Sequence, residues 1–559
     1  MVQILSTIWC TVLLLPFAAG YCTPSNASCW PSAADVAVLN AELDPSIARN
    51  LFWPGGDAPR VTAVPIYSPG DQPLYGQNQN LFPLYTKPDS ETAVCFDQNV
   101  TTLYCTQSAR NNPLSSEPAF VAWPTKPRHV SALVKFASRH NLCVSVAGTG
   151  HDFLNRHSCQ DTPGVMVRTS LFKEVTVNLK DSRGPGGTIR FGAGVVFSEA
   201  HYQASLVKRY IASGWATTVG IVGWSFGGGH GPFAGAAGLG VDNIVEAQVV
   251  LANGDLVTVN SKSNPDLWWA IRGGGGSTWG IVTSLTLRLH KIPRGGFTTL
   301  EYGGSVDYCN SSKLQAIVDG YLKWTLRLDK KWSGLFYLTP TQTPGRGCGG
   351  SVDFFAFYMY THGSDDNDCG LEDFNRTAAA LVFAVNPSPN ATTNAWTAKQ
   401  YNSTWAFVVH KDLEPIVPVT YLPGGLPSVL LNRTVIASGK VTKVLMDQLL
   451  QCPQAGKCHR QELYDDLTGH VDSPRPSDVS IAPGFRSAVI HFLSSSWTTT
   501  EFGPAYAVGA NSYFGESDAN VPNWSDRYWG VNYPKLTQIK AKYDPTGRFG
   551  CRRCVGSAP

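Results

Sequence analysis

A helix, a strand and a glycine turn follow one another without a break in residues 126–153, and this succession limits the folds open to the chain. The stretch "KPRHVSALVKFASRHN" sets apolar residues at helical spacing and has a proline suited to a first turn. "LCVSVA" then alternates as a strand and runs into "GTGHDF". An α+β domain is therefore expected, with a tight turn at the end of a strand and His151 at its tip.

Further patterns extend this domain to residue 294. Strands are expected at "VTVNLK", "TIRFGAG" and "GIVTSLTLRLH", and helices at residues 198–211 and in "NPDLWWAIRGG". Two β-runs in "NIVEAQVVLANGDLVTV" flank Asn253–Gly254, which is a strong hairpin signal. We therefore assign residues 115–294 to one α+β domain.

The rest of the chain divides into four segments. Residues 1–20 have the short apolar core and small-residue end of a cleavable secretory signal, and the run is too short for a membrane anchor. Residues 21–114 hold many Pro, Asn and Cys residues and indicate an extended, disulfide-stapled lead-in. Residues 295–500 mix strand and helix patterns and indicate a second domain, and residues 501–559 close the chain.

Composition excludes several classes of partner. The chain has 559 residues, enough for two domains, and 43% of them are hydrophobic, as in an ordinary globular protein. The formal net charge is +3 and no block of like charges occurs, so neither nucleic acid nor a membrane surface is an expected partner.

Sequons and cysteines favour a secreted glycoprotein. Eight Asn-x-Ser/Thr sequons start at Asn26, Asn99, Asn310, Asn375, Asn390, Asn402, Asn432 and Asn523. Of the 14 cysteines, Cys10 would leave with the signal, so an odd number remains and at least one thiol lacks a partner within the chain. Cys95–Cys105 and Cys452–Cys458 are spaced as local disulfides, and "CRRC" near the C-terminus is expected to be a structural disulfide.

Three other kinds of motif could mark a nucleotide-binding, esterase or metal site. "GTGHDF" and "GAGVVF" lack the third glycine of a dinucleotide-binding turn, and no phosphate-binding P-loop occurs. "GWSFG" matches the nucleophile elbow of esterases with Ser225 as nucleophile, but "GGHGPFAGAAG" behind it is a poor helix start for that chemistry. His230, in "GGGHGP", has no partner at a metal-ligand spacing, so no metal site is expected.

Five segments in order resemble FAD-linked oxidases of the vanillyl-alcohol-oxidase superfamily, nearest to berberine-bridge-enzyme-like proteins of the fungal isoamyl-alcohol-oxidase type. They are "VAWPTKPRHVSALVKFASRHNLCVSVAGTGHDF", "TVGIVGWSFGGGHGP", "GLGVDNIVEAQVVLANGDLVTV", "DLWWAIRGGGGSTWGIVTS" and "NSYFGESDANVPNWSDRYWGVNYPKLTQIKAKYDP". The resemblance runs from residue 115 to 550 and is weakest in 300–500. It implies a bipartite FAD-binding domain of the PCMH type, a sheet-based substrate domain and a C-terminal segment that returns to the FAD domain.

The same resemblance implies how FAD is held. Residues 147–153 would lie over the pyrophosphate, because glycines let backbone N–H groups face phosphates, and His151 would bond covalently to the flavin 8α carbon. Relatives with a second link use the cysteine of "CPTVG", where this chain has "ATTVG" and Ala216, so a single link is expected. Beside His151, the implied FAD contacts are Ala147, Gly148, Thr149, Gly150, Asp152, Phe153, Thr218, Val219, Gly220, Gly223, Gly228, Gly229, Asp242, Ile281 and Val282.

The resemblance implies an oxidase of a hydroxylated small molecule (alcohol, sugar or secondary metabolite), with hydride passing to the flavin and then to O2. Tyr513 is the first candidate for the base that takes the hydroxyl proton and Glu516 the second, although both could be packing residues of a C-terminal strand. Relatives carry Tyr-x-Asn where this chain has Tyr513-Phe514-Gly515.

Val219 matches the position that governs oxygen access in plant relatives, where valine is permissive, although a small core residue is equally expected in this segment. The alternatives are a flavoprotein of natural-product cyclisation or dehydrogenation, and the esterase at Ser225.

Overall fold

The computed structural model describes residues 21–23, 26, 28–43, 51–52 and most of 120–557. Within the last stretch it leaves out residues 123, 155, 158, 160, 161, 163 and 218 and the segments 344–347, 364–370, 386–395, 411–424, 468–478 and 495–499. The predicted signal (1–20), the predicted pair Cys95–Cys105 and the sequons at Asn99 and Asn390 therefore lie outside the described residues, as does Thr218.

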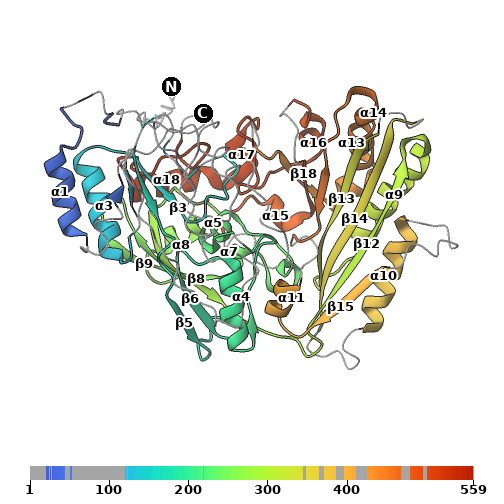
Figure 1. Ribbon diagram of the computed structural model, residues 1–559, viewed down its shortest axis with the longest axis horizontal. Helices are drawn as coiled ribbons and strands as arrows, with labels where there is room; N and C mark the ends of the chain where they lie inside the picture. The colour runs from blue at the N-terminus through green and yellow to red at the C-terminus, as the bar shows by residue number, and fades with distance from the viewer. Residues whose placement is uncertain are drawn as a thin grey trace, which may run out of the picture.

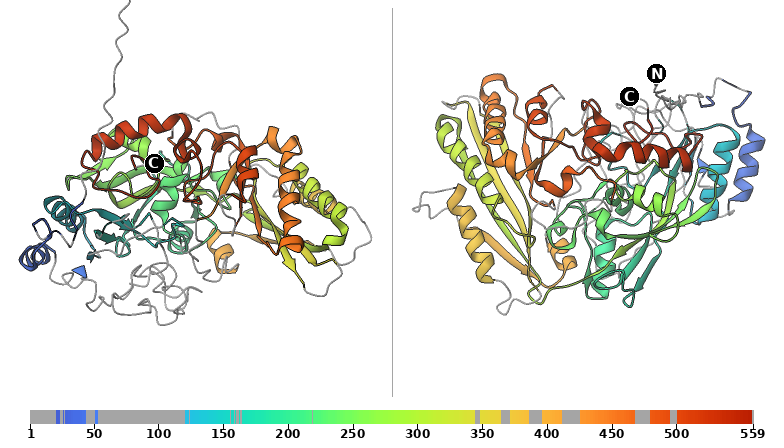
Figure 2. Two further views of the ribbon diagram at one scale, coloured as in Figure 1. Left: turned by 90° about the horizontal axis from the view of Figure 1, so that it is seen from above. Right: turned by 180° about the vertical axis from the view of Figure 1, so that it is seen from behind.

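Two bodies of secondary structure lie side by side, and the C-terminal segment passes from one to the other (Figure 1). The first body contains a four-stranded sheet in the order β1-β2-β4-β3 and a five-stranded sheet in the order β5-β6-β10-β8-β9, and the second body contains a seven-stranded sheet. Figure 2 shows the same division from above and from behind. This arrangement agrees with the predicted division into a first domain of two parts and a second domain built on a sheet.

The four-stranded sheet ends at the glycine turn. Its strands are β1 (Leu51–Phe52), β2 (Phe120–Ala122), β3 (Val144–Ala147) and β4 (Val165–Arg168), and β4 pairs in parallel with β2 and β3. Parallel strands need a crossover connection, and α3 (Pro127–Arg139) supplies it between β2 and β3, which lie on either side of β4. In the lead-in, expected to be extended, Ser32 caps a ten-residue helix, α1 (Ala33–Glu42), which packs on α3.

The five-stranded sheet is antiparallel throughout. It consists of β5 (Val175–Asn178), β6 (Thr188–Gly192), β8 (Ile244–Val250), β9 (Leu256–Val259) and β10 (Ile281–Arg288). The predicted hairpin is confirmed between β8 and β9, where Gly254 adopts a φ of +84°. Short helices α5 (Ile221–Gly227), α6 (Ala234–Ala237), α7 (Gly240–Asn243) and α8 (Pro265–Ile271) lie in the connections.

The helix predicted over residues 198–211 is shorter than expected. It runs as α4 (Phe197–Leu206) and ends before Lys208, whose φ of +54° is not helical. The chain then forms β7 (Arg209–Tyr210), which pairs with β11 (His290–Lys291). Pairing with a strand 80 residues away overrides the local helical pattern.

The seven-stranded sheet is antiparallel and runs in the order β15-β12-β14-β13-β17-β18-β16. Its strands are β12 (Phe297–Asp307), β13 (Trp332–Gln342), β14 (Gly350–Thr361), β15 (Thr397–Tyr401), β16 (Ser428–Asn432), β17 (Gln461–Tyr464) and β18 (Ala488–Ser494). The helices α9 (Ser311–Thr325), α10 (Leu371–Val385) and α13 (Lys440–Leu449) cover the outer face (Figure 1). Because side chains alternate along a strand, the other set of residues faces the first body.

The C-terminal segment joins the two bodies. It begins beside the seven-stranded sheet with α16 (Gly503–Val508) and continues through α17 (Trp524–Trp529) to α18 (Tyr533–Tyr543), which packs on α8 of the first body. The carbonyl oxygen of Arg548 accepts a hydrogen bond from the N–H of Val144, the first residue of β3, at 3.1 Å. The predicted return to the FAD domain is confirmed.

Five disulfides are present in the described chain: Cys22–Cys29, Cys143–Cys159, Cys309–Cys348, Cys452–Cys458 and Cys551–Cys554. The last two confirm the pairs expected from spacing. Of the described sequon asparagines, all are exposed except Asn432, which is half-buried and caps a helix by accepting from the N–H of Val435. Over the described residues, no helix combines the length and the apolar character needed to cross a bilayer.

Candidate active site

A cavity of about 400 Å³ lies where the two bodies and the C-terminal segment meet. The first body contributes the glycine turn after β3, residues 214–216, 219, 220 and 222–224, and residues 276, 277, 279, 280 and 282. The seven-stranded sheet contributes residues from β17 and β18, and the C-terminal segment contributes residues 513–516. A cavity of this size, with apolar walls and a few converging polar groups, is typical of a cofactor or substrate site.

Most of the residues implied as FAD contacts line this cavity. They are Gly148, Thr149, Gly150, His151, Asp152, Phe153, Val219, Gly220, Gly223 and Val282. Ala147, Gly228, Gly229, Asp242 and Ile281 do not line it, and Thr218 lies outside the described residues. The cavity also contains Ala216, the position at which relatives carry a second flavin-linking cysteine.

The five residues away from the cavity have other surroundings. Ile281 is buried on the face of β10 opposite to that of Val282, as the alternation of a strand requires. The carboxylate of Asp242 accepts from the N–H of Leu239 at 3.0 Å and pairs with Arg486 at 2.5 Å.

Three glycines leave the backbone bare at the cavity. A Cβ added at Gly223 would meet nothing within 4 Å, one at Gly276 would approach only the Gly223 Cα at 3.9 Å, and one at Gly148 would approach only the Thr169 Oγ1 at 3.8 Å. Side chains at these positions would fill the cavity. The open cradle therefore fits a large, partly flat cofactor that touches the backbone, as FAD does.

His151 stands at the tip of the glycine turn. Gly150 has a φ of +87°, which glycine adopts without strain, and it lets the chain turn so that His151 lines the cavity. Burial lowers the pKa of His151 to about 4. The imidazole is therefore neutral at ordinary pH and keeps the lone pair that a bond to a flavin carbon requires.

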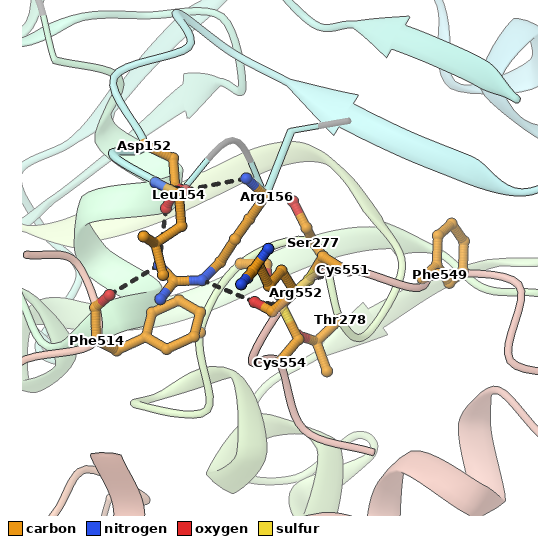
Figure 3. Close-up of a disulfide and its surroundings, with 12 residues drawn as sticks. Asp152, Leu154, Arg156, Ser277, Thr278, Phe514, Phe549, Cys551, Arg552 and Cys554 are labelled. Carbon is orange, nitrogen blue, oxygen red and sulfur yellow. Dashed lines mark hydrogen bonds and ion pairs between the residues drawn. A yellow bond between two sulfur atoms is a disulfide. The ribbon is translucent and has the colours of Figure 1, made fainter. Parts of the chain in front are cut away.

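Arg156 fastens this turn to the C-terminal segment (Figure 3). Its Nη1 donates to the carboxylate of Asp152 and to the carbonyl of Phe514, both at 2.8 Å, and its guanidinium lies 3.8 Å from the Phe514 ring centre. Nη2 donates to the Ser517 Oγ at 2.6 Å, and Nε donates to the carbonyl of Arg552 at 3.2 Å, inside the Cys551–Cys554 loop. The sequence analysis missed Arg156, because its other partners, Phe514, Ser517 and Arg552, lie 358, 361 and 396 residues away.

A second cluster centres on His230. Its Nδ1 lies 2.8 Å from the carboxylate of Asp466, and its Nε2 lies 3.1 Å from the carboxylate of Glu516. The Nε1–H of Trp215 donates to the same Asp466 oxygen at 2.6 Å, and Nδ1 of His491 lies 3.3 Å from the Glu516 oxygen that faces His230. The cluster combines the loop after α5, the chain just beyond β17, the middle of β18 and the C-terminal segment.

The two histidines of this cluster differ in charge. Burial lowers the pKa of His230, but the carboxylates of Asp466 and Glu516 outweigh burial and raise it to about 10. Burial holds the pKa of His491 well below its ordinary value, and the neighbouring charge of His230 adds to the effect. His230 is therefore an imidazolium at neutral pH, and His491 is a neutral imidazole.

No sequence pattern indicated that His230 has charged partners. One ring nitrogen each of His230 and His491 and one carboxylate oxygen of Glu516 lie within 4.8 Å of one another, although the three residues are far apart in the sequence. Of their contacts, the one of 3.1 Å between His230 and Glu516 is a hydrogen bond, whereas the neutral His491 lies 3.3 Å from Glu516 without forming one.

The sheet presents a polar stripe to the cavity. Glu462 and Tyr464 on β17 and Arg460, the residue just before the strand begins, are spaced two apart and all line the cavity. Arg460 Nη2 donates to Glu462 at 2.6 Å, the Tyr464 hydroxyl donates to the other Glu462 oxygen at 3.0 Å, and Tyr337 on β13 lies 3.0 Å from that hydroxyl. Burial raises the pKa of Glu462, and Arg460 opposes this shift. No sequence motif indicated this stripe.

The two candidate bases both line the cavity, but they lie in a loop and not in a C-terminal strand. Tyr513 is 3% exposed, and its hydroxyl accepts from the N–H of Gly229 at 3.3 Å. Burial and the charge of Glu516 raise the pKa of Tyr513 far above its ordinary value. A Cβ at Gly515 would approach the Tyr513 ring to 2.6 Å, so the ring position requires glycine where relatives have asparagine.

Ser225 does not support an esterase. It lies inside α5, is fully buried and does not line the cavity. A nucleophile elbow requires the serine to be exposed at a sharp turn between a strand and a helix. The esterase interpretation is wrong.

Two family models match parts of this chain, and known proteins resemble it over most of its length. The FAD binding domain family matches residues 118–260, and the berberine and berberine-like family matches residues 512–555. An FAD-linked oxidoreductase, easE, of Epichloe festucae var. lolii is 39% identical over 474 residues, covering 79% of this chain and 74% of that one. A VAO-type flavoprotein oxidase, VAO615, of Thermothelomyces thermophilus is 25% identical over 566 residues, covering 96% and 92%.

Solved structures share the fold. The VAO-type flavoprotein MtVAO615 from Myceliophthora thermophila C1 superposes with a TM-score of 0.71 at 23% identity, covering 96% of this chain and 97% of that one. A chitooligosaccharide oxidase superposes with a TM-score of 0.64 at 20% identity, covering 83% and 97%.

Proposed function

This chain belongs to the FAD-linked oxidoreductases of the vanillyl-alcohol-oxidase superfamily that end in a berberine-like segment, and we propose that it is a secreted oxidase of a hydroxyl-bearing small molecule. FAD, when bound, accepts a hydride from the substrate carbon and passes the electrons to O2, giving H2O2. One observation carries the proposal: His151, three bare-backbone glycines and the carboxylate of Glu516 line a single cavity.

The first body of the chain holds FAD in this proposal. Gly148, Gly223 and Gly276 would offer backbone to the cofactor, and the neutral His151 would be the residue that holds the flavin covalently, at its 8α carbon. Ala216 has no group that could form a second link, so we expect one attachment. Arg156 keeps the turn in place through its contacts to Asp152 and to the C-terminal segment.

Glu516 is the proton acceptor in this proposal, ahead of Tyr513. A carboxylate takes a proton directly, and the Glu516 side chain is 23% exposed, so a substrate hydroxyl can reach it. The Tyr513 phenol keeps its proton because its pKa is raised, and its buried hydroxyl serves to orient neighbouring groups. The structure thus favours the second of the two residues selected from the sequence.

The seven-stranded sheet supplies the substrate wall. The rings of Tyr337 and Tyr464 and the Arg460–Glu462 pair offer stacking surfaces and hydrogen-bond donors and acceptors, which suit a polar, hydroxylated substrate. The named relatives include a chitooligosaccharide oxidase, which supports hydroxylated carbohydrates as the first compounds to test. Five disulfides and exposed sequon asparagines support secretion through an oxidising compartment.

The test is a substrate screen on the purified flavoprotein, in which alcohols, sugars and phenolic metabolites are supplied with air and H2O2 is measured. The expected result is peroxide formed in step with an oxidised product. Flavin that is reduced by a substrate but persists reduced in air, while an artificial acceptor reoxidises it, would make the protein a dehydrogenase. A cyclised product would instead place it with enzymes of natural-product cyclisation.

A further inference from the structure

We propose that Asp466 and His230 form a positioning pair that fixes the carboxylate of Glu516 at the cavity wall through a charge-assisted hydrogen bond. The inference rests on the proposed function, because Glu516 is the proposed proton acceptor. It assigns a role to two residues, 236 positions apart in sequence, that no motif connects.

His230 is the donor in both of its hydrogen bonds to the carboxylates of this cluster. Ionised carboxylates only accept, so His230 donates from Nδ1 to Asp466 at 2.8 Å and from Nε2 to Glu516 at 3.1 Å. Donating from both nitrogens requires the imidazolium. A hydrogen bond between a charged donor and a charged acceptor is roughly twice as strong as a neutral one, so His230 holds Glu516 firmly in place.

The three side chains differ in how much of each is exposed. Asp466 is fully buried, His230 is 4% exposed and Glu516 is 23% exposed, so only the last of the three can readily meet a substrate. Trp215 donates to the same Asp466 oxygen that His230 contacts, at 2.6 Å, and thereby locks the carboxylate in one rotamer. His230 also lines the cavity, although little of its side chain is exposed, whereas Asp466 does not line it. In this proposal both residues act through Glu516.

The groups that face the pair come from every surrounding element. The sheet presents Glu462, Tyr464 and His491, and the C-terminal segment presents Tyr513. His491 is neutral, and both tyrosines keep their protons because their pKa values are raised. The cation on His230 is therefore balanced chiefly by Asp466 and Glu516, and removing one carboxylate changes the charge that the other experiences.

The neighbouring Asp465 provides a matched control. It is equally buried, but its carboxylate points away from His230 and accepts from the hydroxyls of Tyr321, at 2.5 Å, and Tyr358. Asp465→Asn and Asp466→Asn make the same chemical change one residue apart. Only the second removes the partner of His230.

The first measurement is the pH dependence of flavin reduction by substrate, followed without oxygen. In Asp466→Asn, His230 loses its stabilising carboxylate, and Glu516 loses its cationic donor as His230 becomes neutral. We expect the acid limb of the rate profile to move up by about one pH unit, which is a tenfold loss of rate at a pH on that limb. Asp465→Asn should leave the limb in place. An unshifted limb in Asp466→Asn, or an equal shift in Asp465→Asn, would overturn the proposal.

The second measurement needs no substrate. Because the pKa of His230 is raised from 6.5 to about 10, the native state binds more protons than the unfolded state in this window, and stability falls as pH rises through it. The Tm of the wild-type flavoprotein should therefore decline between pH 6.5 and about 10. Because burial raises the pKa of Asp465 to about 7, the variants are compared from about pH 8 to about 10, where the decline should be smaller in Asp466→Asn than in wild type and Asp465→Asn. Equal declines in all three proteins would refute the pairing.

His230→Gln replaces Asp466→Asn if that variant does not accumulate as a soluble flavoprotein, since it keeps a donor toward Glu516 but removes the charge. It should show the same upward shift of the acid limb and the same flattened Tm profile, and normal values of both would again refute the pair. A wild-type protein that no hydroxylated compound reduces would defeat the proposed function, while the Tm profile would still decide the pairing.

Discussion

At the scale of single residues, His151 carries the prediction of covalent flavin, because the glycine turn places its side chain at the cavity. His151→Ala removes the only nitrogen proposed to bond to the flavin, so acid precipitation should leave yellow colour in the pellet of wild type and release it from the variant. Mass spectrometry of wild type should find one flavin peptide, containing residue 151. A colourless wild-type pellet would exclude covalent attachment.

Tyr513 and Glu516 can be separated by substitutions that keep shape. Glu516→Gln removes the carboxylate, and loss of a general base typically slows the chemical step about 10²–10⁴-fold. Tyr513→Phe removes a phenol that keeps its proton, so we expect a smaller effect on flavin reduction. Stopped-flow reduction with flavin content as the control checks both. A larger loss in Tyr513→Phe than in Glu516→Gln would reverse the assignment.

Val219 lies in the cavity wall beside Gly220 and Ala216, where one methylene changes the free space. Interiors carry few voids larger than a water molecule, so Val219→Leu should obstruct a passage for dioxygen. We expect slower reoxidation of the reduced flavin by air and little change in its reduction by substrate. Val219→Ala is the matched control and should reoxidise at least as fast as wild type. Equal reoxidation rates in all three proteins would show that residue 219 does not control the access of oxygen.

At the scale of elements, the glycine turn and the C-terminal segment are one unit, because Arg156 contacts both (Figure 3). Arg156→Met keeps most of the aliphatic stem but removes the guanidinium over the Phe514 ring and its hydrogen bonds to Asp152, Phe514 and Ser517. We expect less flavin to be incorporated and a lower Tm than in wild type. Arg183→Met is a surface control, since its partner Asp181 lies away from the cavity. Normal flavin content in Arg156→Met would show that the turn holds its shape alone.

The elements also show where local patterns suffice. The apolar stripe of α3, the alternation of β3 and the Asn253–Gly254 turn are local signals, and each predicted element is present. The helix expected to reach Ile211 stops at Leu206, because β7 pairs with β11 across the domain. The helix α1 was missed because its pattern is weak and its packing surface on α3 is supplied by another segment.

At the scale of the whole molecule, buried neutral histidines set a limit to acid stability. Burial lowers the pKa of His157 and His290 to about 4 and that of His201 to about 3. The unfolded chain therefore binds more protons than the native one from pH 6.5 down to these values, and stability falls as pH falls. We expect the Tm to drop steadily below pH 6.5, and replacement of His201 by Gln to reduce the slope. A flat profile from pH 6.5 to 4 would contradict these burial effects.

The sequence by itself determined the fold class, the glycine turn with His151 and the return of the C-terminal segment, because helix and strand periodicity, turn chemistry and ordered motifs are written in neighbouring residues. It also drew attention to Tyr513 and Glu516, though in the opposite order to the one that the structure favours. Only the tertiary structure decided the environment of Glu516. His230 and Glu516 are 286 residues apart, and the segments that carry them meet only when the two bodies and the C-terminal segment close on one cavity. Burial and charge, which set what each side chain can do there, depend on that closure, and no local pattern records it.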